Sequence, residues 1–389
     1  MRLLVLILAL FAGRLAADAL ALYLTWYGDP STTMAIQWHT PLSEESDEIQ
    51  LHSSSRDWKK AIGTHLELGD RLVHKVLLEK LTPDTEYSFR LGDNPAIYKF
   101  RTAPKTLNGS LRFCIGGDFY QTPDLFRKMC RIVSNKDPLF VVLGGDIAYA
   151  VNKNPFRLRS TPKKQWFSFL QEWKEEMISP EGQVIPFLIV PGNHDISPDD
   201  SELFFALFSF PKKQLYRAID FGNYLSLLLL DSDIFEPIEG TQTEWLESAL
   251  RSRSQIPFRF AVYHLSAYPS VYPYAAEIPL KIRTYWCPLF DKYRLPAAFE
   301  NHNHAYKRTF PIRGNKVDDS GVIYLGDGCW GALPRVTKNA WYLEKHERKN
   351  NAFLIELTPT SAKIEAVGLQ GEIIDSLQIP SGEDLTTRS

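Results

Sequence analysis

The chain has 389 residues, 44% of them hydrophobic and 13% aromatic, which is enough apolar material for two domains with buried cores. Its 44 Lys and Arg residues nearly balance its 46 Asp and Glu residues, so the formal net charge is -2. A chain this close to neutral lacks the basic field that favours nonspecific binding to nucleic acid or to an anionic membrane. We therefore expect small-molecule substrates and no nucleic-acid partner.

The first residues have the layout of a signal peptide. One arginine precedes an apolar run over residues 3–12, and small residues follow at Ala16 and Ala17. The run is shorter than the ~20 residues of a membrane-spanning helix, and no later stretch is long enough, so we predict no stable membrane span. We predict a signal peptide over residues 1–17 and a secreted or periplasmic protein. A buried N-terminal helix is the alternative.

The cysteines are few and scattered, at Cys114, Cys130, Cys287 and Cys329. Their spacing matches neither a CxxC zinc motif nor a dense disulfide framework. We expect small buried core residues, although one disulfide stays open as an alternative.

Short strand-like runs with turns between them fill the first part of the chain, at residues 20–28, 32–39, 71–78, 86–91 and 97–102. Alternation at Met34, Ile36 and Trp38 places one side of a strand on a core. The pattern predicts an all-β sandwich domain over residues 20–104. The segment 81–87 resembles the strand-connecting corner of fibronectin type III-like domains, in which the hydroxyl of a tyrosine, here Tyr87, bonds to nearby backbone.

After the linker at residues 102–105 the pattern changes to apolar strands alternating with amphipathic helices. Residues 162–177 are the clearest helix, with Trp166, Phe169 and Trp173 on one face. We predict an α/β domain with mixed sheets over residues 108–382, followed by a tail at 383–389.

Five predicted strands of this domain end at polar residues, which are Asp118, Asp146, Asn193 with His194 and Asp195, His264, and the run of His302 and His304. Loops at the carboxyl ends of strands converge in open α/β sheets, so these side chains are expected to share one site. Any one of them has an ordinary alternative as a helix cap or a satisfied polar residue.

The residue types suit two metal ions. Asp118 and His304 are expected to bind one ion, and Asn193, His264 and His302 the other, with Asp146 bridging both. Glycines before Asp118, Asp146 and Asn193 are expected to supply turns with positive φ.

The blocks Gly117-Asp118, Gly145-Asp146-Ile147-Ala148-Tyr149, Gly192-Asn193-His194-Asp195, Val262-Tyr263-His264 and Asn301-His302-Asn303-His304 resemble those of purple acid phosphatases, a branch of the calcineurin-like metallophosphoesterases. The N-terminal sandwich resembles that of the plant-type members. The resemblance implies that Tyr149 is a phenolate ligand to Fe(III), with Zn, Mn or Fe as the divalent partner ion. A tyrosine packed under the next helix is the alternative.

The resemblance implies hydrolysis of phosphate monoesters, in acid, by a metal-bound hydroxide. His194 is expected to stabilise or protonate the leaving oxygen, with Asp195 orienting its ring; a purely structural His194 is the alternative. Two positions depart from the family pattern: Phe119 and Tyr120 follow Asp118, and Asn301 stands where glycine is usual. We expect Asn301 to keep the turn because asparagine tolerates left-handed φ.

The substrate side has weaker candidates, Tyr272, Tyr274 and Arg283, in a loop without the extra histidines of many relatives; rim scaffolding is the alternative for each. Diester, nucleotide or pyrophosphate hydrolysis on the same metals is a rival function. A secreted interaction protein with structural metals is another. The expected partners are small phosphorylated substrates, and a monomer and a homodimer both stay open.

Overall fold

The computed structural model describes residues 18–53, 57–151, 160–196, 201–208, 210 and 214–381. The predicted signal peptide and tail lie outside these residues. Among the helices that are described, none has the length and apolar character needed to cross a membrane.

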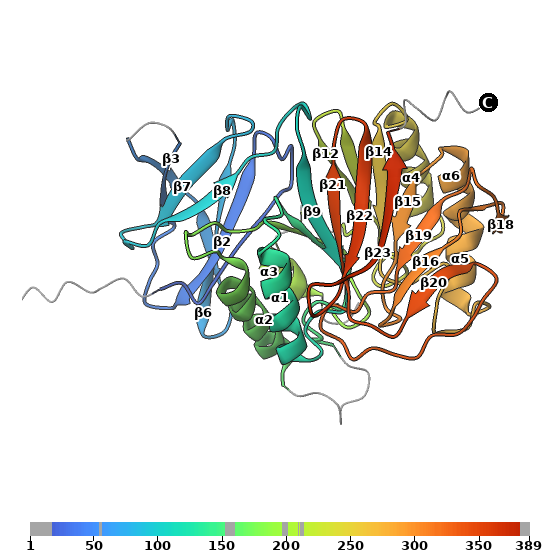
Figure 1. Ribbon diagram of the computed structural model, residues 1–389. Coiled ribbons are helices and arrows are strands. Elements are labelled where there is room, and N and C mark those ends of the chain that lie inside the picture. Colours follow the sequence, from blue (N-terminus) through green and yellow to red (C-terminus); the bar gives the residue numbers. More distant parts are fainter. Residues whose placement is uncertain are drawn as a thin grey trace, which may run out of the picture.

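Two four-stranded antiparallel sheets form the N-terminal domain, which lies at one end of the molecule in Figure 1. One sheet consists, in order, of β1 (Ala21–Thr25), β2 (Met34–Pro41), β6 (Arg71–Leu78) and β5 (Thr64–Glu67). The other consists of β4 (Lys59–Ile62), β3 (Glu48–His52), β7 (Glu86–Leu91) and β8 (Tyr98–Arg101). The predicted all-β domain is confirmed.

Strands β1 and β2 of the first sheet are buried on both faces, whereas the alternation predicted only one buried face. Met34, Ile36 and Trp38 enter the sandwich core. On the opposite face, Gln37 and Tyr23 donate hydrogen bonds to the carbonyl of Leu207 in α3 (Glu202–Phe208), at 2.7 Å each. The second domain therefore covers the outer face of this sheet.

Two stacked sheets make the centre of the second domain. One consists, in order, of β11 (Phe187–Ile189), β10 (Val141–Leu143), β9 (Leu111–Gly116), β21 (Ala352–Leu357), β22 (Ser361–Val367) and β23 (Ile373–Pro380). The other consists of β12 (Arg217–Phe221), β13 (Leu225–Leu229), β14 (Phe258–Val262), β15 (Ala297–Phe299), β19 (Ile323–Gly326), β16 (Tyr306–Thr309) and β20 (Leu343–Glu347). A small hairpin pairs β17 (Ile312–Arg313) with β18 (Lys316–Val317).

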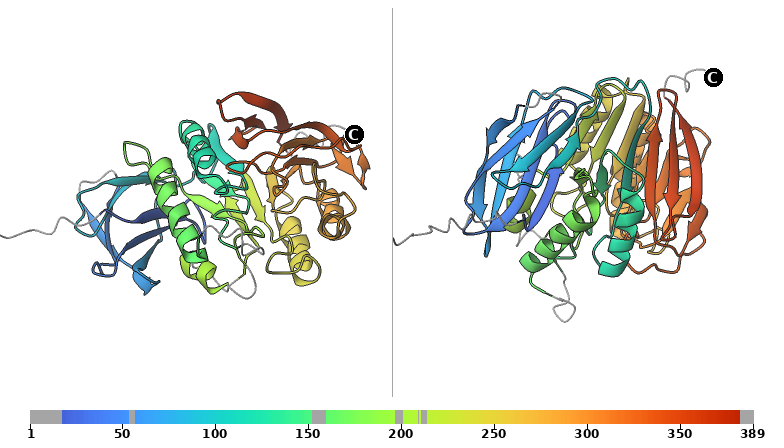
Figure 2. Two further views of the ribbon diagram at one scale, coloured as in Figure 1. Left: turned by 90° about the horizontal axis from the view of Figure 1, so that it is seen from below. Right: turned by 60° about the vertical axis from the view of Figure 1, so that its left-hand side comes forward.

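Helices cover the outer faces of both sheets, as the two views in Figure 2 show. α1 (Pro123–Ser134), α2 (Pro162–Met177) and α3 pack on the first sheet. α4 (Thr241–Ser252), α5 (Glu277–Tyr285) and α6 (Cys287–Lys292) pack on the second. The mixed α/β architecture and the bounds of α2 are as predicted.

The two domains share one hydrophobic core. The Trp26 ring of the sandwich meets Phe140 and Phe221 of the second domain edge to face, with ring centroids 5.8 and 5.7 Å apart. The linker is part of this contact, because Ala103 is fully buried and Tyr224 donates a 3.1 Å hydrogen bond to the carbonyl of Pro104. The sandwich is thus fixed against the α/β domain.

Two local expectations are also met. The hydroxyl of Tyr87 accepts a 2.8 Å hydrogen bond from the backbone amide of Thr82, as the corner motif predicted. All four cysteines are buried and unpaired, which supports their interpretation as core residues and argues against the disulfide.

Candidate metal centre

The polar strand ends of the second domain meet at one place. β9, β10 and β11 run parallel in one sheet, and β14, β15 and β19 run parallel in the other. Because the two sheets are stacked, the loops after β9, β10, β11, β14 and β15 bring together Asp118, Asp146, Asn193, His264, His302 and His304.

One group of donors surrounds Asp118. His304 Nε2 lies 2.9 Å from Asp118 Oδ1, and the Tyr149 hydroxyl lies 3.3 Å from that oxygen and 3.2 Å from His304 Nε2. Asp118 is fully buried and Asp146 is 1% exposed. One donor atom each of Asp118, Asp146 and His304 lies within 4.8 Å of the other two, so the three can bind a common ion.

A second group surrounds His264. Its Nε2 lies 3.3 Å from Asp146 Oδ1 and 3.2 Å from Asn193 Oδ1, while its Nδ1 faces the carbonyl of Gly144 at 3.0 Å. Donor atoms of Asp146, His264 and His302 also lie within 4.8 Å of one another. Asp146 belongs to both groups, which is the position expected of a bridging carboxylate.

The donor atoms fit metal ions better than they fit one another. Asp146 Oδ2 and His302 Nδ1 are buried without a hydrogen-bond partner, a costly state for polar atoms. Burial, and then the charges of Asp118 and Asp146, raise the pKa of Tyr149 well above its usual range, so a phenolate here needs a cation. Carboxylates, imidazoles, an amide oxygen and a phenol together form a donor set suited to two transition-metal ions.

The backbone of this centre is held in an unfavourable conformation. Asp118, Asp146, Tyr149, His302 and His304 have φ between 51° and 76°, a region that residues other than glycine seldom occupy. Such conformations cost about 1–3 kcal/mol each and cluster at functional sites. The surrounding packing must therefore impose these ligand positions.

The glycines act differently from the prediction. Only Gly145 has the expected positive φ, at 92°. Gly117 and Gly192 are required by space, because a Cβ there would lie 2.3 Å from Asn301 Oδ1 and 2.0 Å from the amide nitrogen of Asp146. The aspartates themselves carry the left-handed turns.

The expected left-handed turn at Asn301 is also wrong, since the positive φ falls on His302, at 76°. The Asn301 side chain instead donates to the carbonyl of Tyr263 at 2.9 Å. The preceding Glu300 is buried, accepts from the Tyr263 hydroxyl at 2.6 Å and is ion-paired with Lys307. Asn301 and Glu300 are thus both buried and bonded to Tyr263, directly before His302 in the chain.

His194 lies at the centre, but Asp195 does not orient it. His194 Nδ1 lies 2.7 Å from the carbonyl of Val151, and its Nε2 points to Asp146 Oδ2 at 4.0 Å. The ring is 29% exposed and stacks on Tyr149 at 5.1 Å. The backbone carbonyl therefore fixes the ring through Nδ1–H and leaves Nε2 facing the site.

The Asp195 carboxylate has a different task from the one predicted. It accepts hydrogen bonds from the backbone amides of Ile147 at 2.7 Å and Gly192 at 2.9 Å. Burial, and then the charge of Asp146, raise the pKa of Asp195 to about 8. Asp195 thus ties together the two loops that present Asp146 and Asn193.

Of the three candidates on the substrate side, only Tyr272 lies at the centre. Its ring stacks on His302 with centroids 5.0 Å apart, and it lines a cleft of about 520 Å³ together with Asn193 and His194. Arg283 instead donates to the carbonyl of Tyr274 and lies over the Tyr274 ring, 3.6 Å from its centroid. This pair supports the loop behind the cleft.

Arg335 is a residue of the site that the motifs did not indicate. Its guanidinium donates to the Tyr272 hydroxyl at 2.5 Å and to the carbonyl of His302 at 3.2 Å, and its own amide donates to the carbonyl of His304 at 2.8 Å. A fixed positive charge therefore lies beside the donors. The sequence signal is only a lone arginine in an irregular segment between β19 and β20.

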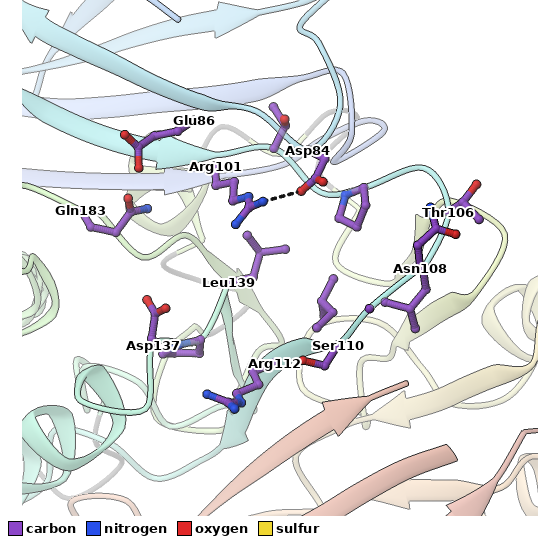
Figure 3. Close-up of a pocket in the computed structure, with 16 residues that line it drawn as sticks. Asp84, Glu86, Arg101, Thr106, Asn108, Ser110, Arg112, Asp137, Leu139 and Gln183 are labelled. Atoms are coloured by element: carbon purple, nitrogen blue, oxygen red, sulfur yellow. Dashed lines mark hydrogen bonds and ion pairs between the residues drawn. The ribbon is translucent and has the colours of Figure 1, made fainter. Parts of the chain in front are cut away.

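A second cleft, of about 570 Å³, lies between the sandwich and the start of β9 (Figure 3). Arg101 and Asp84 form a 2.8 Å ion pair on one side of it, and Arg112 and Asp137 line the other. The metal donors follow the opposite end of β9, and none of the predicted site residues lines this cleft.

Comparisons with known proteins agree with this geometry. Residues 20–102 match the model of the purple acid phosphatase N-terminal domain, and residues 113–315, more than half of the chain, match that of the calcineurin-like phosphoesterases. Purple acid phosphatase 23 of Arabidopsis thaliana is 26% identical over an alignment of 302 positions, which covers 68% of this chain and 64% of the relative's own length. The chain thus spans less than two thirds of that relative.

Solved structures show the same fold. The purple acid phosphatase PPD1 from yellow lupin seeds superposes with a TM-score of 0.75 at 16% identity, over 94% of this chain and 75% of its own. The structure of PhoD gives a TM-score of 0.66 at 12% identity, over 93% and 88%. With both family models matched in chain order, this chain belongs to the purple acid phosphatase branch of the calcineurin-like phosphoesterases.

Proposed function

We propose that this chain is an acid phosphatase that hydrolyses phosphate monoesters at a dinuclear metal centre. The observation that carries the proposal is the sharing of Asp146 between two groups of donors. Carboxylates that serve two ions a few ångströms apart are typical of enzymes that cleave phosphate esters.

The donor types suggest which ions are held. We assign Fe(III) to Asp118, Tyr149 and His304, because a phenolate favours a hard trivalent ion, and a divalent Zn, Mn or Fe to Asn193, His264 and His302. Such ions supply Lewis-acid charge and lower the pKa of the attacking water, and Fe(III) lowers it enough for turnover in acid.

The chain's own residues complete the site. His194, oriented by Val151, holds Nε2 beside the donors, where it can give a proton to the leaving oxygen. Arg335 can bind a non-bridging phosphate oxygen through its guanidinium, and Tyr272 fixes that guanidinium in place. Arg335 would thus supply part of what the extra histidines supply in many other members.

A second candidate is hydrolysis of diesters, nucleotides or pyrophosphates. The cleft of about 520 Å³ beside Asn193 and His194 extends along Leu265, Pro269 and Ile278, which leaves room for a leaving group larger than a small alcohol. Comparing kcat/KM for an aryl phosphate monoester, a diester and ATP between pH 4 and 8 decides between the two. Negligible monoester hydrolysis would reject our first choice. If metal-loaded protein hydrolysed none of these three substrates, the result would favour another hypothesis, a secreted interaction protein whose metals are structural.

The identity of the first ion has a spectroscopic test. A tyrosinate bound to Fe(III) gives a purple charge-transfer band, so we expect this band in the iron-loaded protein and its loss in Tyr149→Phe. A colourless protein that contains only Zn or Mn would contradict Fe(III), and with it the acidic optimum.

Further proposals concern the protein's setting. We propose export by the signal peptide at residues 1–17, small phosphorylated substrates, and a monomer or homodimer. We also propose that the catalytic domain extends over residues 108–382, beyond the sandwich at 20–104.

A further inference from the structure

A second cluster of metal-binding residue types lies in the N-terminal sandwich, away from the metal centre. Asp47 precedes β3 in one sheet, whereas His65 of β5 and His74 of β6 belong to the other. His65 and His74 are directly opposite each other in the antiparallel pairing of these strands. The cluster therefore joins the two sheets of the sandwich.

The three side chains point their donor atoms at one spot. His74 Nδ1 lies 2.7 Å from Asp47 Oδ1, and His65 Nδ1 lies 2.9 Å from Asp47 Oδ2. All three donor atoms are within 4.8 Å of one another. The His74 side chain is fully buried, Asp47 is 19% exposed and His65 is 33% exposed, so the cluster has one closed and one open side.

The hydrogen bonds of Thr40 determine which ring nitrogen of His74 carries a hydrogen. The Thr40 hydroxyl lies 3.0 Å from the backbone carbonyl of Glu44 and 2.7 Å from His74 Nε2. The hydroxyl has one proton and the carbonyl has none, so satisfying both contacts requires that His74 Nε2 carry a hydrogen and donate it to Thr40. A neutral His74 then has a bare lone pair on Nδ1.

That lone pair faces a carboxylate oxygen at 2.7 Å. Two acceptors at this distance repel each other unless a positive species lies between or beside them. The parallel stacking of Trp38 on the His74 ring, with centroids 4.8 Å apart, and the bond to Thr40 hold the ring in this orientation. The arrangement therefore suits a cation held between Asp47 and His74.

We propose that Asp47, His65 and His74 bind a zinc ion, or a divalent ion of similar preference, that is separate from the dinuclear centre. Two imidazole nitrogens and a carboxylate oxygen are a common zinc donor set, and water on the open side of His65 completes a tetrahedron. The ion ties the loop before β3 to strands β5 and β6. Its role is structural, because it clamps the two sheets together.

The test measures zinc per chain in the full-length protein after zinc loading and desalting. His65→Gln and Asp47→Asn should each contain one zinc fewer than the wild type, with phosphatase activity unchanged. His65→Gln is decisive if Asp47→Asn fails to fold, because the His65 side chain is 33% exposed and its loss leaves no buried cavity of comparable size. The test compares the zinc content of the variants with that of the wild type. Its result can therefore be interpreted even if the protein lacks the proposed phosphatase activity.

His52→Gln is the matched control. His52 belongs to the same domain, but its Nδ1 bonds to the carbonyl of Ser53 and not to the cluster. The zinc content of His52→Gln should equal that of the wild type. Equal zinc in the wild type and His65→Gln would overturn the proposal, and would mean that a proton on His74, rather than a metal, neutralises the cluster.

Discussion

The dinuclear centre and the sandwich cluster, which consists of Asp47, His65 and His74, use similar side chains on very different backbones. Asp118, Asp146 and His304 of the centre occupy loops with φ above 50°, whereas His65 and His74 occupy paired strands. Regular strands bring two of the three donors together without backbone strain, and Asp47, just before β3, has no positive φ, so the sandwich cluster needs no special turn. The centre must bring seven donors from separate loops to one place and still admit a substrate, and its strained backbone reflects that demand.

The contrast extends to the residues behind the donors. Asp195 holds two ligand loops through their amides, and Glu300, two residues before His302, forms a buried ion pair with Lys307. In the sandwich, the corresponding support is a threonine hydroxyl and one tryptophan ring. We therefore expect substitutions at the centre to alter activity, and those at the sandwich cluster to alter metal content and stability without altering activity.

The largest effect is expected for Asp146→Ala, which removes the carboxylate shared by both groups. Loss of both ions should lower kcat/KM by roughly a thousandfold or more. Asp319→Ala, at an exposed aspartate, should be unchanged. Substantial residual turnover in Asp146→Ala with both metals retained would contradict the bridging role.

A smaller effect is expected for Gly145→Ala, which tests whether the strained loops position the ligands. Its Cβ would lie 2.5 Å from His264 Nδ1 at φ +92°, so we expect displaced His264, loss of one metal and roughly a hundredfold lower activity. Gly314→Ala is the control, since its φ is also positive, at 56°, but nothing lies within 4 Å of the new Cβ. Gly314→Ala should lose about 1 kcal/mol of stability, Gly145→Ala should lose more because of the added clash, and only Gly145→Ala should lose metal. Full metal content in Gly145→Ala would show that the loop tolerates the side chain.

The smallest effect is expected for Arg335→Met, which removes one charged hydrogen bond to the phosphate. Such a bond contributes about 1.5–3 kcal/mol, so kcat/KM should fall about tenfold to a hundredfold, with both metals retained. Arg335→Lys should recover only part of this, because an ammonium group lacks the planar fork. Unchanged kinetics in Arg335→Met would assign Arg335 to loop support alone.

The parts of the molecule that could be predicted are those whose sequence has a hydrophobic period or a recognisable motif. The apolar face of residues 162–177 placed α2, and strand ends followed by aspartate, asparagine or histidine placed the metal donors. Arg335 could not be found in this way, because it lies in an irregular loop 31 positions after His304 and reaches the site only through tertiary contacts.

The sandwich cluster was missed for a related reason. β5 is short and polar, with the sequence Thr-His-Leu-Glu, so its weak alternation did not indicate a strand. The pairing of His65 with His74, and the approach of Asp47 from the other sheet, depend on registers that no local pattern specifies. The role of Asp195 was wrong because adjacency in sequence to His194 does not fix which donor its carboxylate meets.

The most direct test of the two-metal account is phosphate release from an aryl phosphate monoester before and after metal exchange. Chelation should abolish turnover, and reloading with iron and zinc should restore it in proportion to occupancy, reaching full activity at two ions in the dinuclear centre of the His65→Gln protein. Using that variant keeps the sandwich cluster from contributing to the count. Fully loaded protein that releases no phosphate, or turnover that survives complete metal removal, would contradict the account.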